Sequence, residues 1–145
     1  MKGLIQRVSS ASVVIEGSTV GEIGQGLLLF LGIERMDTEE LAHKMLRKVL
    51  SYRVFADDQG KMNRSLSDAG GGLLVVSQFT LVANTAKGSR PGFSSGASPE
   101  LGERLYDCFL RQARLVHPVV GSGIFGADMQ VSLTNDGPVT FLLEV

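Results

Sequence analysis

Three polar side chains, those of Ser77, Gln78 and Thr80, lie among the four residues that follow the apolar run Leu73–Val76. A short continuous apolar run of this kind is typical of a strand buried on both faces, so the strand would deliver hydroxyl and amide groups to its end. A loop rich in Gly, Ser and Pro follows at residues 84–98. A rigid strand that ends beside a long loop is a common setting for a binding or catalytic site. The alternative is that the polar residues only mark the point at which the strand leaves the core.

Side chains suited to acid–base or nucleophilic catalysis are few. The two histidines, His43 and His117, lie far apart in the sequence and fit neither a catalytic triad nor the spacing of a metal site. The single cysteine, Cys108, can form no intramolecular disulfide, and we expect it in the core. Asp57 and Asp58 fall in an evident turn. Because few side chains could act as a general acid or base, the sequence favours a mechanism that uses backbone N–H groups and a group on the substrate.

The composition indicates one globular domain spanning residues 1–145. Hydrophobic residues make up 43% of the chain and charged residues 20%, which is typical of a folded protein rather than a disordered one. The formal net charge of −1 argues against binding DNA or other nucleic acid through bulk charge but allows a local basic patch. No signal-peptide pattern opens the sequence, and no apolar run approaches the roughly 20 residues of a membrane span. We therefore expect a cytoplasmic protein without membrane association.

Strand patterns dominate both ends of the chain. Three strands joined by short glycine-containing turns predict an antiparallel meander. The first runs from Leu4–Val8 to Ser12–Ile15 with a possible bulge or bend between these segments, the second contains Val20 and Ile23, and the third is Leu27–Leu31. Near the other end, alternation over residues 129–134 predicts a strand with one buried face. Asn135–Pro138 then carries strong turn signals before a last strand.

Two helices are predicted between these strand regions. Asp37 followed by Glu40 fits a capping box at the start of the first helix. His43 lies on the polar side of this helix, where we expect it to be solvated. Ser98 as N-cap and Pro99 at the first helical position begin the second helix. Together these elements predict an α+β fold, with two helices packed on a mostly antiparallel, barrel-like sheet.

Two short motifs carry a family resemblance. Ser77–Leu81 together with Asn135–Thr140 resembles the signature pair of the D-aminoacyl-tRNA deacylases, also called D-tyrosyl-tRNA deacylases. The order and separation of the two motifs and the length of the chain fit this family. Further matching segments are spread over the whole chain: Leu4–Val8, Gly60–Asn63, Arg90-Pro91, Phe93, Gly96–Pro99 and Ala127–Met129.

The resemblance implies an editing hydrolase that cleaves the ester of D-aminoacyl-tRNA, with no metal or organic cofactor. It also implies a homodimer in which each subunit inserts Gly137 and Pro138, joined by a cis peptide bond, into the site of its partner. Their carbonyl groups would exclude an L side chain, whereas D-aminoacyl-tRNA and glycyl-tRNA would be accepted. Arg7 matches a family arginine that holds the Gly-Pro pair in place. From the sequence alone the bond would be trans, since only about 5–6% of such bonds in folded proteins are cis.

For the chemical step, the resemblance implies that the 2′-hydroxyl of the terminal ribose assists the attack of water on the ester. The N–H groups of Phe79 and Thr80 would stabilise the oxyanion. Ser77 and Gln78 would hold the adenosine end of the tRNA, which is the expected partner.

Two alternative functions stay open at this point. Thr80 could be the nucleophile of an esterase acting on small D-amino-acid esters, although no base is evident beside it. The chain could instead be a non-enzymatic dimer that binds tRNA ends through the local patch Lys87, Arg90, Arg111 and Arg114. Lys87 and Arg90 are also the candidate tRNA contacts of the deacylase. Turnover of D-aminoacyl-tRNA, compared with a D-aminoacyl ester that lacks the ribose, separates the three functions.

Overall fold

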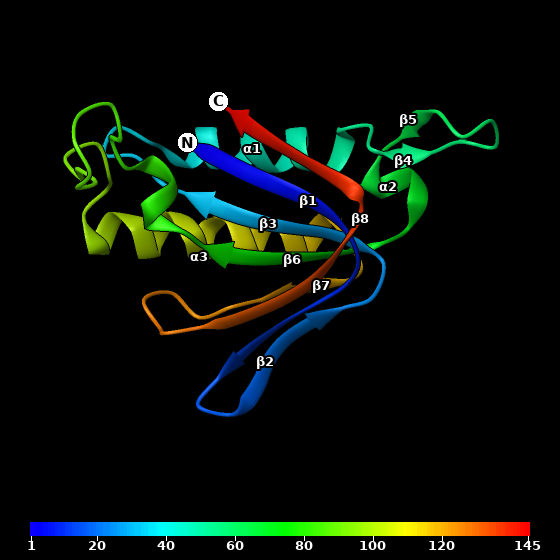
Figure 1. Ribbon diagram of the computed structural model, residues 1–145, viewed down its shortest axis with the longest axis horizontal. Coiled ribbons are helices and arrows are strands. Elements are labelled where there is room, and N and C mark those ends of the chain that lie inside the picture. The colour runs from blue at the N-terminus through cyan, green and yellow to red at the C-terminus, as the bar shows by residue number, and fades with distance from the viewer.

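The long first strand, β1 (Lys2–Ile15), organises the sheet in the computed structural model, which describes residues 1–145 (Figure 1). Its N-terminal half pairs with β3 (Gly26–Gly32) and its C-terminal half with β2 (Ser18–Ile23), both antiparallel. Its other edge pairs, also antiparallel, with β8 (Gln130–Glu144). The predicted meander is wrong, because β1 is long enough to lie beside both of the strands that follow it.

Two parallel pairings extend the sheet from β3. β6 (Gly72–Ser77) lies beside β3, and β7 (Val120–Ser122) lies beside β6, which gives the order β2-β1-β3-β6-β7. The sheet curls until β2 contacts β7, so it forms a nearly closed barrel (Figure 1). The predicted α+β class with a barrel-like sheet is confirmed, and the two parallel pairings are its only departure from antiparallel order within the large sheet.

Two helices, α1 (Glu39–Ser51) and α3 (Pro99–Val116), pack on one face of the sheet. Their apolar stripes and the facing residues of β3 and β6 form the main core, while a smaller cluster fills the other side of the sheet. Leu73–Val76 is buried throughout, as the sequence predicts for a strand covered on both faces. None of the helices has the length and apolar character that a membrane span requires.

The starts of the two long helices differ in how well the sequence predicts them. Ser98 accepts a hydrogen bond from the N–H of Leu101 and Pro99 opens α3, so that prediction is confirmed. The predicted cap at Asp37 is wrong, because Thr38 is the N-cap of α1 and accepts from the N–H of Leu41. The carboxylate of Asp37 instead accepts a hydrogen bond from the positively charged α-ammonium of Met1.

The two histidines and the cysteine are tied into the packing. Cys108 is buried, as predicted, and its Sγ lies 3.7 Å from the Nε2 of His43. His43 is half-buried between α1 and α3, so the prediction of a solvated side chain is wrong. His117 caps the end of α3 and places its Nε2 2.7 Å from the carbonyl oxygen of Gly71.

A short segment with its own secondary structure connects α1 to β6. It consists of a short hairpin, β4 (Phe55–Ala56) with β5 (Met62–Arg64), and of the four-residue helix α2 (Leu66–Ala69). The turn predicted at Asp57 and Asp58 lies in this hairpin. Hydrogen bonds from the Lys61 N–H and the Asn63 side chain hold the pKa of Asp57 below its usual value.

The strong turn signal at Asn135–Pro138 does not reverse the chain, so the predicted turn is wrong. Asn135 pairs with Val8 and Thr140 pairs with Gln6, which leaves residues 136–139 as a bulge within β8. The Asn135 side chain accepts from the N–H of Val139 at 2.8 Å and so closes the bulge locally. Residues with turn-forming preferences therefore form a bulge at 136–139, and the strand continues on both sides of it.

The N-terminus is a buried structural element. The side chain of Met1 is in the main core, and its α-ammonium donates to Asp37 Oδ1 at 2.8 Å and to Glu34 Oε2 at 2.9 Å. Burial by itself would lower the pKa of this amine. The hydrogen bonds and negative charges of Asp37 and Glu34 outweigh burial, so the pKa is raised above its ordinary value.

This pKa shift predicts an alkaline loss of stability. A folded-state pKa above the unfolded value of 8.0 means that the stabilisation is complete below pH 8 and is lost as the pH rises through the folded-state pKa. Urea denaturation at several pH values between about 7 and 10 should therefore show a falling free energy of unfolding. The double variant Glu34→Gln/Asp37→Asn lacks both partners and should show a smaller fall. Equal falls in the two proteins would contradict the assignment.

Candidate active site

The polar end of β6 leaves the extended conformation directly after Ser77. The N–H of Gln78 donates to the carbonyl oxygen of Leu31 at 2.8 Å, and the chain then forms a single turn of 3-10 helix, η1 (Phe79–Val82). This turn packs over the end of β3 at Gly32, where a Cβ atom would lie 2.9 Å from Cγ1 of Val82. The missing side chain of Gly32 therefore lets η1 approach the sheet.

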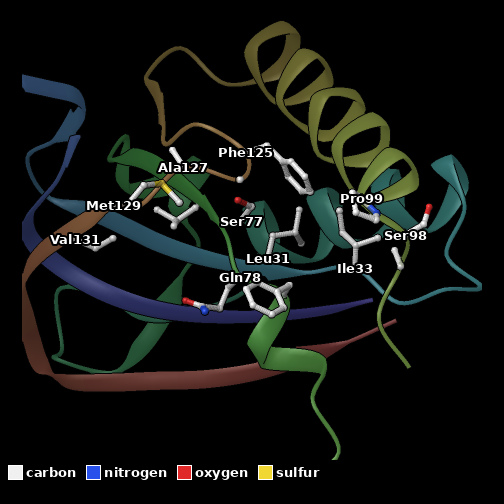
Figure 2. A pocket seen from close by; sticks show the side chains of 15 residues that line it. Leu31, Ile33, Ser77, Gln78, Ser98, Pro99, Phe125, Ala127, Met129 and Val131 are labelled. Atoms are coloured by element: carbon white, nitrogen blue, oxygen red, sulfur yellow. The ribbon is translucent and has the colours of Figure 1, made fainter. Parts of the chain in front are cut away.

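A cavity of about 480 Å³ opens beside this strand end (Figure 2). Its walls come from β3, the end of β6, the start of α3 and the segment before β8, and nine of its 15 lining residues are hydrophobic. Figure 2 shows Ser77 facing the same space as Phe125 and Met129. None of the lining residues has an ionisable side chain, so the cavity suits a largely apolar, uncharged group.

The wall that carries Phe125 is tied to β6 through Tyr106 of α3. Its hydroxyl lies 2.9 Å from the carbonyl oxygen of Val75 and 3.3 Å from that of Gly123. Burial raises the pKa of Tyr106 far above its ordinary value, so the hydroxyl keeps its proton and remains a donor. The cavity is thus built on rigid, buried elements.

The structure brings three of the four residues predicted as catalytic into the cavity lining: Ser77, Gln78 and Phe79. The fourth, Thr80, is exposed, and its hydroxyl accepts a hydrogen bond from the Gln78 amide instead of lining the cavity. Phe79 is 67% exposed, and its ring centroid lies 5.2 Å from that of Phe93 in the following loop. Phe79 and Thr80 begin η1, where the helix offers no preceding carbonyl to their N–H groups, so these donors are free to meet a ligand.

Arg7 holds the bulge that contains Gly137 and Pro138. Its Nε donates to the carbonyl oxygen of Asp136 at 2.9 Å, and its guanidinium also donates to the carbonyl oxygen of Val54 at 2.6 Å. The Gly137–Pro138 bond is cis, and Gly137 has a φ of 137°. Both residues are exposed, and neither lines the cavity of its own chain.

Lys87 and Arg90 are exposed in the loop between η1 and α3, and no ion pair engages them. The loop is fastened at its base by two backbone hydrogen bonds between Asn84 and Gly92. No group of three or more His, Cys, Asp or Glu side chains is placed to hold a metal ion. The expectation that no cofactor is needed stays a prediction.

Sequence reasoning missed most of the apolar lining. Ile33, Phe125 and Val131 carry no signal that distinguishes them from ordinary core residues. Met129 and Ala127 lie in a segment that matched the family, but their place in the wall follows only from the fold. Pro99 was predicted as a helix start and lies in the matching segment Gly96–Pro99, and it contributes to the wall as well.

The fold and the candidate site together define a barrel-like α+β protein with a cavity at a strand end whose lining lacks ionisable side chains. Residues 4–144 match the family described as D-Tyr-tRNA(Tyr) deacylase. The chain is 63% identical over 144 residues to the D-aminoacyl-tRNA deacylase of Stutzerimonas stutzeri strain A1501, covering 99% of each chain. It is 61% identical over 145 residues to that of Pseudoalteromonas atlantica strain T6c, covering 100% of each. The chain therefore belongs to the D-Tyr-tRNA(Tyr) deacylase family, which confirms the predicted family and the predicted enzyme class, a hydrolase.

Two solved structures are also similar. One, named c-Myc DNA Unwinding Element Binding Protein, superposes with a TM-score of 0.95 at 41% sequence identity. The superposition covers 100% of this chain and 99% of that protein's chain. The other, a probable eukaryotic D-amino acid tRNA deacylase, gives a TM-score of 0.84 at 18% identity, with 99% of this chain and 98% of its own covered. At that identity the second likeness speaks for the fold alone.

Proposed function

We propose that this protein hydrolyses the ester that joins a D-amino acid to the 3′-terminal adenosine of tRNA, and that it accepts glycyl-tRNA as well. The observation that carries the proposal is the strand end Ser77–Phe79, which borders an uncharged cavity in a chain of this family. The products are free tRNA and the free amino acid. Because tRNA is aminoacylated and used in the cytoplasm, we assign the reaction to the cytoplasm.

The cavity receives the terminal adenosine. Its apolar walls, including Phe125 and Met129, suit the faces of a planar base, and the polar groups of Ser77 and Gln78 suit its edges and the ribose. The ester then lies at the cavity mouth near η1, where the N–H groups of Phe79 and Thr80 can donate to the carbonyl oxygen.

The chemical step relies on the substrate. Since no ionisable side chain lines the cavity, the nearest group able to orient or activate water is the 2′-hydroxyl of the terminal ribose. Water attacks the carbonyl carbon, the backbone donors stabilise the oxyanion, and the 3′-oxygen leaves with a proton. The protein contributes position and hydrogen-bond donors.

Selection against L-amino acids is assigned to a second copy of the chain. Gly137 and Pro138 are exposed and lie outside the cavity of their own subunit, which fits a role in the cavity of a partner. The exposed apolar side chains of Phe79, Phe141 and Leu142 supply surface that a homodimer would bury. Carbonyl groups at Gly137 and Pro138 would then collide with an L side chain and leave room for a D side chain or for glycine.

Lys87 and Arg90 are assigned to the phosphate backbone of the tRNA near its 3′ end. Both are exposed, and the loop that carries them contributes Ala97 and Ser98 to the cavity wall. Neutralising each should weaken tRNA binding more at low salt than at high salt.

One comparison of substrates tests the proposed function. Hydrolysis of D-aminoacyl-tRNA, L-aminoacyl-tRNA and a D-aminoacyl ester without ribose should differ strongly, with rapid turnover of the first only. Turnover of the simple ester would indicate an esterase with a protein nucleophile. Binding without turnover of any of the three would indicate a tRNA-end-binding protein. A DNA duplex serves as a binding control, because the name of one structural relative refers to DNA.

Replacement of Thr80 by alanine should leave substantial deacylation. Its hydroxyl is exposed, is bonded to the Gln78 amide and has no base beside it, so the loss should be that of one neutral hydrogen bond, less than about tenfold in rate. Single-turnover hydrolysis of D-aminoacyl-tRNA measures the effect. A loss of several orders of magnitude in a folded variant, or a trapped acyl-enzyme, would make Thr80 the nucleophile.

A further inference from the structure

The α-ammonium of Met1 organises the segment between β3 and α1. Asp37 receives the ammonium on Oδ1 and the N–H of Glu34 on Oδ2 at 2.7 Å. The N–H of Asp37 in turn donates to the carbonyl oxygen of Glu34 at 3.0 Å. The Asp37 side chain is only 4% exposed, so its charge depends on the ammonium for neutralisation.

The same segment supports one wall of the cavity. The N–H of Ala97 donates to the carbonyl oxygen of Ile33 at 3.1 Å, and the N–H of Arg35 donates to that of Ser95 at 3.0 Å. Ile33 and Ala97 both line the cavity. The residues on either side of Glu34 therefore fix the wall through backbone hydrogen bonds.

The connection continues to the strand end. Ser95 donates through its hydroxyl to the carbonyl oxygen of Val82, at 2.6 Å, and Val82 closes η1. Phe79 begins η1 and lines the cavity. Hydrogen bonds, joined by the backbone on either side of Glu34, thus lead from the ammonium through Asp37 to the cavity wall and to η1.

We propose that the free α-amino group of Met1, held by Asp37 and Glu34, is a positioning group for the hydrolytic site. If its charge is removed by a formyl or acetyl group, Asp37 is left buried without a counter-charge, and the segment 33–37 moves away to solvate it. Ile33 and Ala97 then shift together, and the adenosine pocket loses its shape. The proposal rests on the proposed function for its kinetic consequence and on the contacts above for its structural one.

The test compares the protein with a free α-amine and the same protein acetylated only at that amine, prepared by semisynthesis. Single-turnover deacylation of D-aminoacyl-tRNA well below the melting temperature should fall about tenfold, the size of couplings carried by packed networks. Amide hydrogen exchange at Arg35 and Ala97 should become faster, while exchange at the core strand β6 should stay slow. Equal rates and equal local protection in the two proteins would overturn the proposal.

Side-chain variants separate a local effect from a loss of folding. Asp37→Asn should reproduce the acetylated protein, Glu34→Gln should have a smaller effect because that carboxylate is 32% exposed, and Asp37→Glu should recover part of the activity. Glu39→Gln removes a carboxylate from the first turn of α1 that does not touch the ammonium, and it should behave like the wild type. If Asp37→Asn fails to fold, the comparison of Glu34→Gln with Glu39→Gln still decides, and equal activity and local exchange in these two would count against the proposal.

The failure of the proposed function would be recognised separately. An unmodified protein that does not hydrolyse D-aminoacyl-tRNA would refute the function, whereas hydrogen exchange at Arg35 and Ala97 and the affinity for adenosine would still report on the wall. Weaker adenosine binding and faster local exchange on acetylation would support the positioning role even then. Unchanged values of both would overturn it.

Discussion

Hydrolysis of a D-aminoacyl-tRNA that ends in 2′-deoxyadenosine should be slower by about 10²-fold or more than hydrolysis of the same substrate ending in adenosine. None of the residues that line the cavity has an ionisable side chain, so the cavity lining supplies no side chain that could act as a general base. The ribose 2′-hydroxyl is adjacent to the ester and is held with it. Removing this hydroxyl should therefore cost more than alanine substitution at Ser77, Gln78 or Thr80.

The measurement is single-turnover hydrolysis at saturating enzyme, with the binding of each tRNA determined separately. Saturation matters because a lost ribose hydroxyl can also weaken binding, and only the rate at equal occupancy reports on chemistry. A slow 2′-deoxy substrate at full occupancy supports assistance by the substrate. Equal rates at equal occupancy would mean that a protein group performs this role, and Thr80 would be the first candidate.

The architecture could be predicted well from the sequence where local patterns agree with the fold. The buried strand Leu73–Val76, the helix start at Ser98 and Pro99, and the buried Cys108 follow from periodicity and capping preferences that tertiary contacts reinforce. The predictions failed where a distant partner competes with a local one. Asp37 is a good N-cap residue, but the α-ammonium 36 positions away attracts its carboxylate more strongly than an orphan N–H does.

The site was predictable in its polar part only. Ser77 and Gln78 stand out because polar residues end a buried run, whereas Phe125 and Ile33 have the side chains of ordinary core residues. The bulge at residues 136–139 shows a second limit, because Asn-Asp-Gly-Pro has the same local chemistry in a hairpin turn as in a bulge. Only the pairing of β8 with β1 on both sides of the bulge decides between them.

Substitution of Gly137 by alanine should reduce deacylation by about 10²-fold, the cost of misplacing a positioning group by about 1 Å. Gly137 has a φ of 137°, which strains an L-amino acid, and a Cβ there would lie 2.7 Å from Cγ2 of Val139 and 3.1 Å from a guanidinium nitrogen of Arg7. The bulge must therefore shift and release Arg7. Gly17→Ala is the matched control, because Gly17 has a φ of 80° with no atom within 4 Å of the added Cβ. It should cost stability without a comparable loss of activity.

Mixing two inactive variants then tests whether Gly137 acts in its own subunit or in a partner. Ala97→Trp fills the cavity with an indole but leaves Gly137 intact, and Gly137→Ala leaves the cavity open. If Gly137 completes the cavity of the other subunit, a mixed dimer has one working site, and random re-association of equal amounts should restore about a quarter of the wild-type activity. If Gly137 acts within its own chain, every site in the mixture carries a defect and no activity should return. Recovery on mixing, measured after the subunits have exchanged, would thus assign the Gly137–Pro138 segment to the partner's site independently of any measurement of mass.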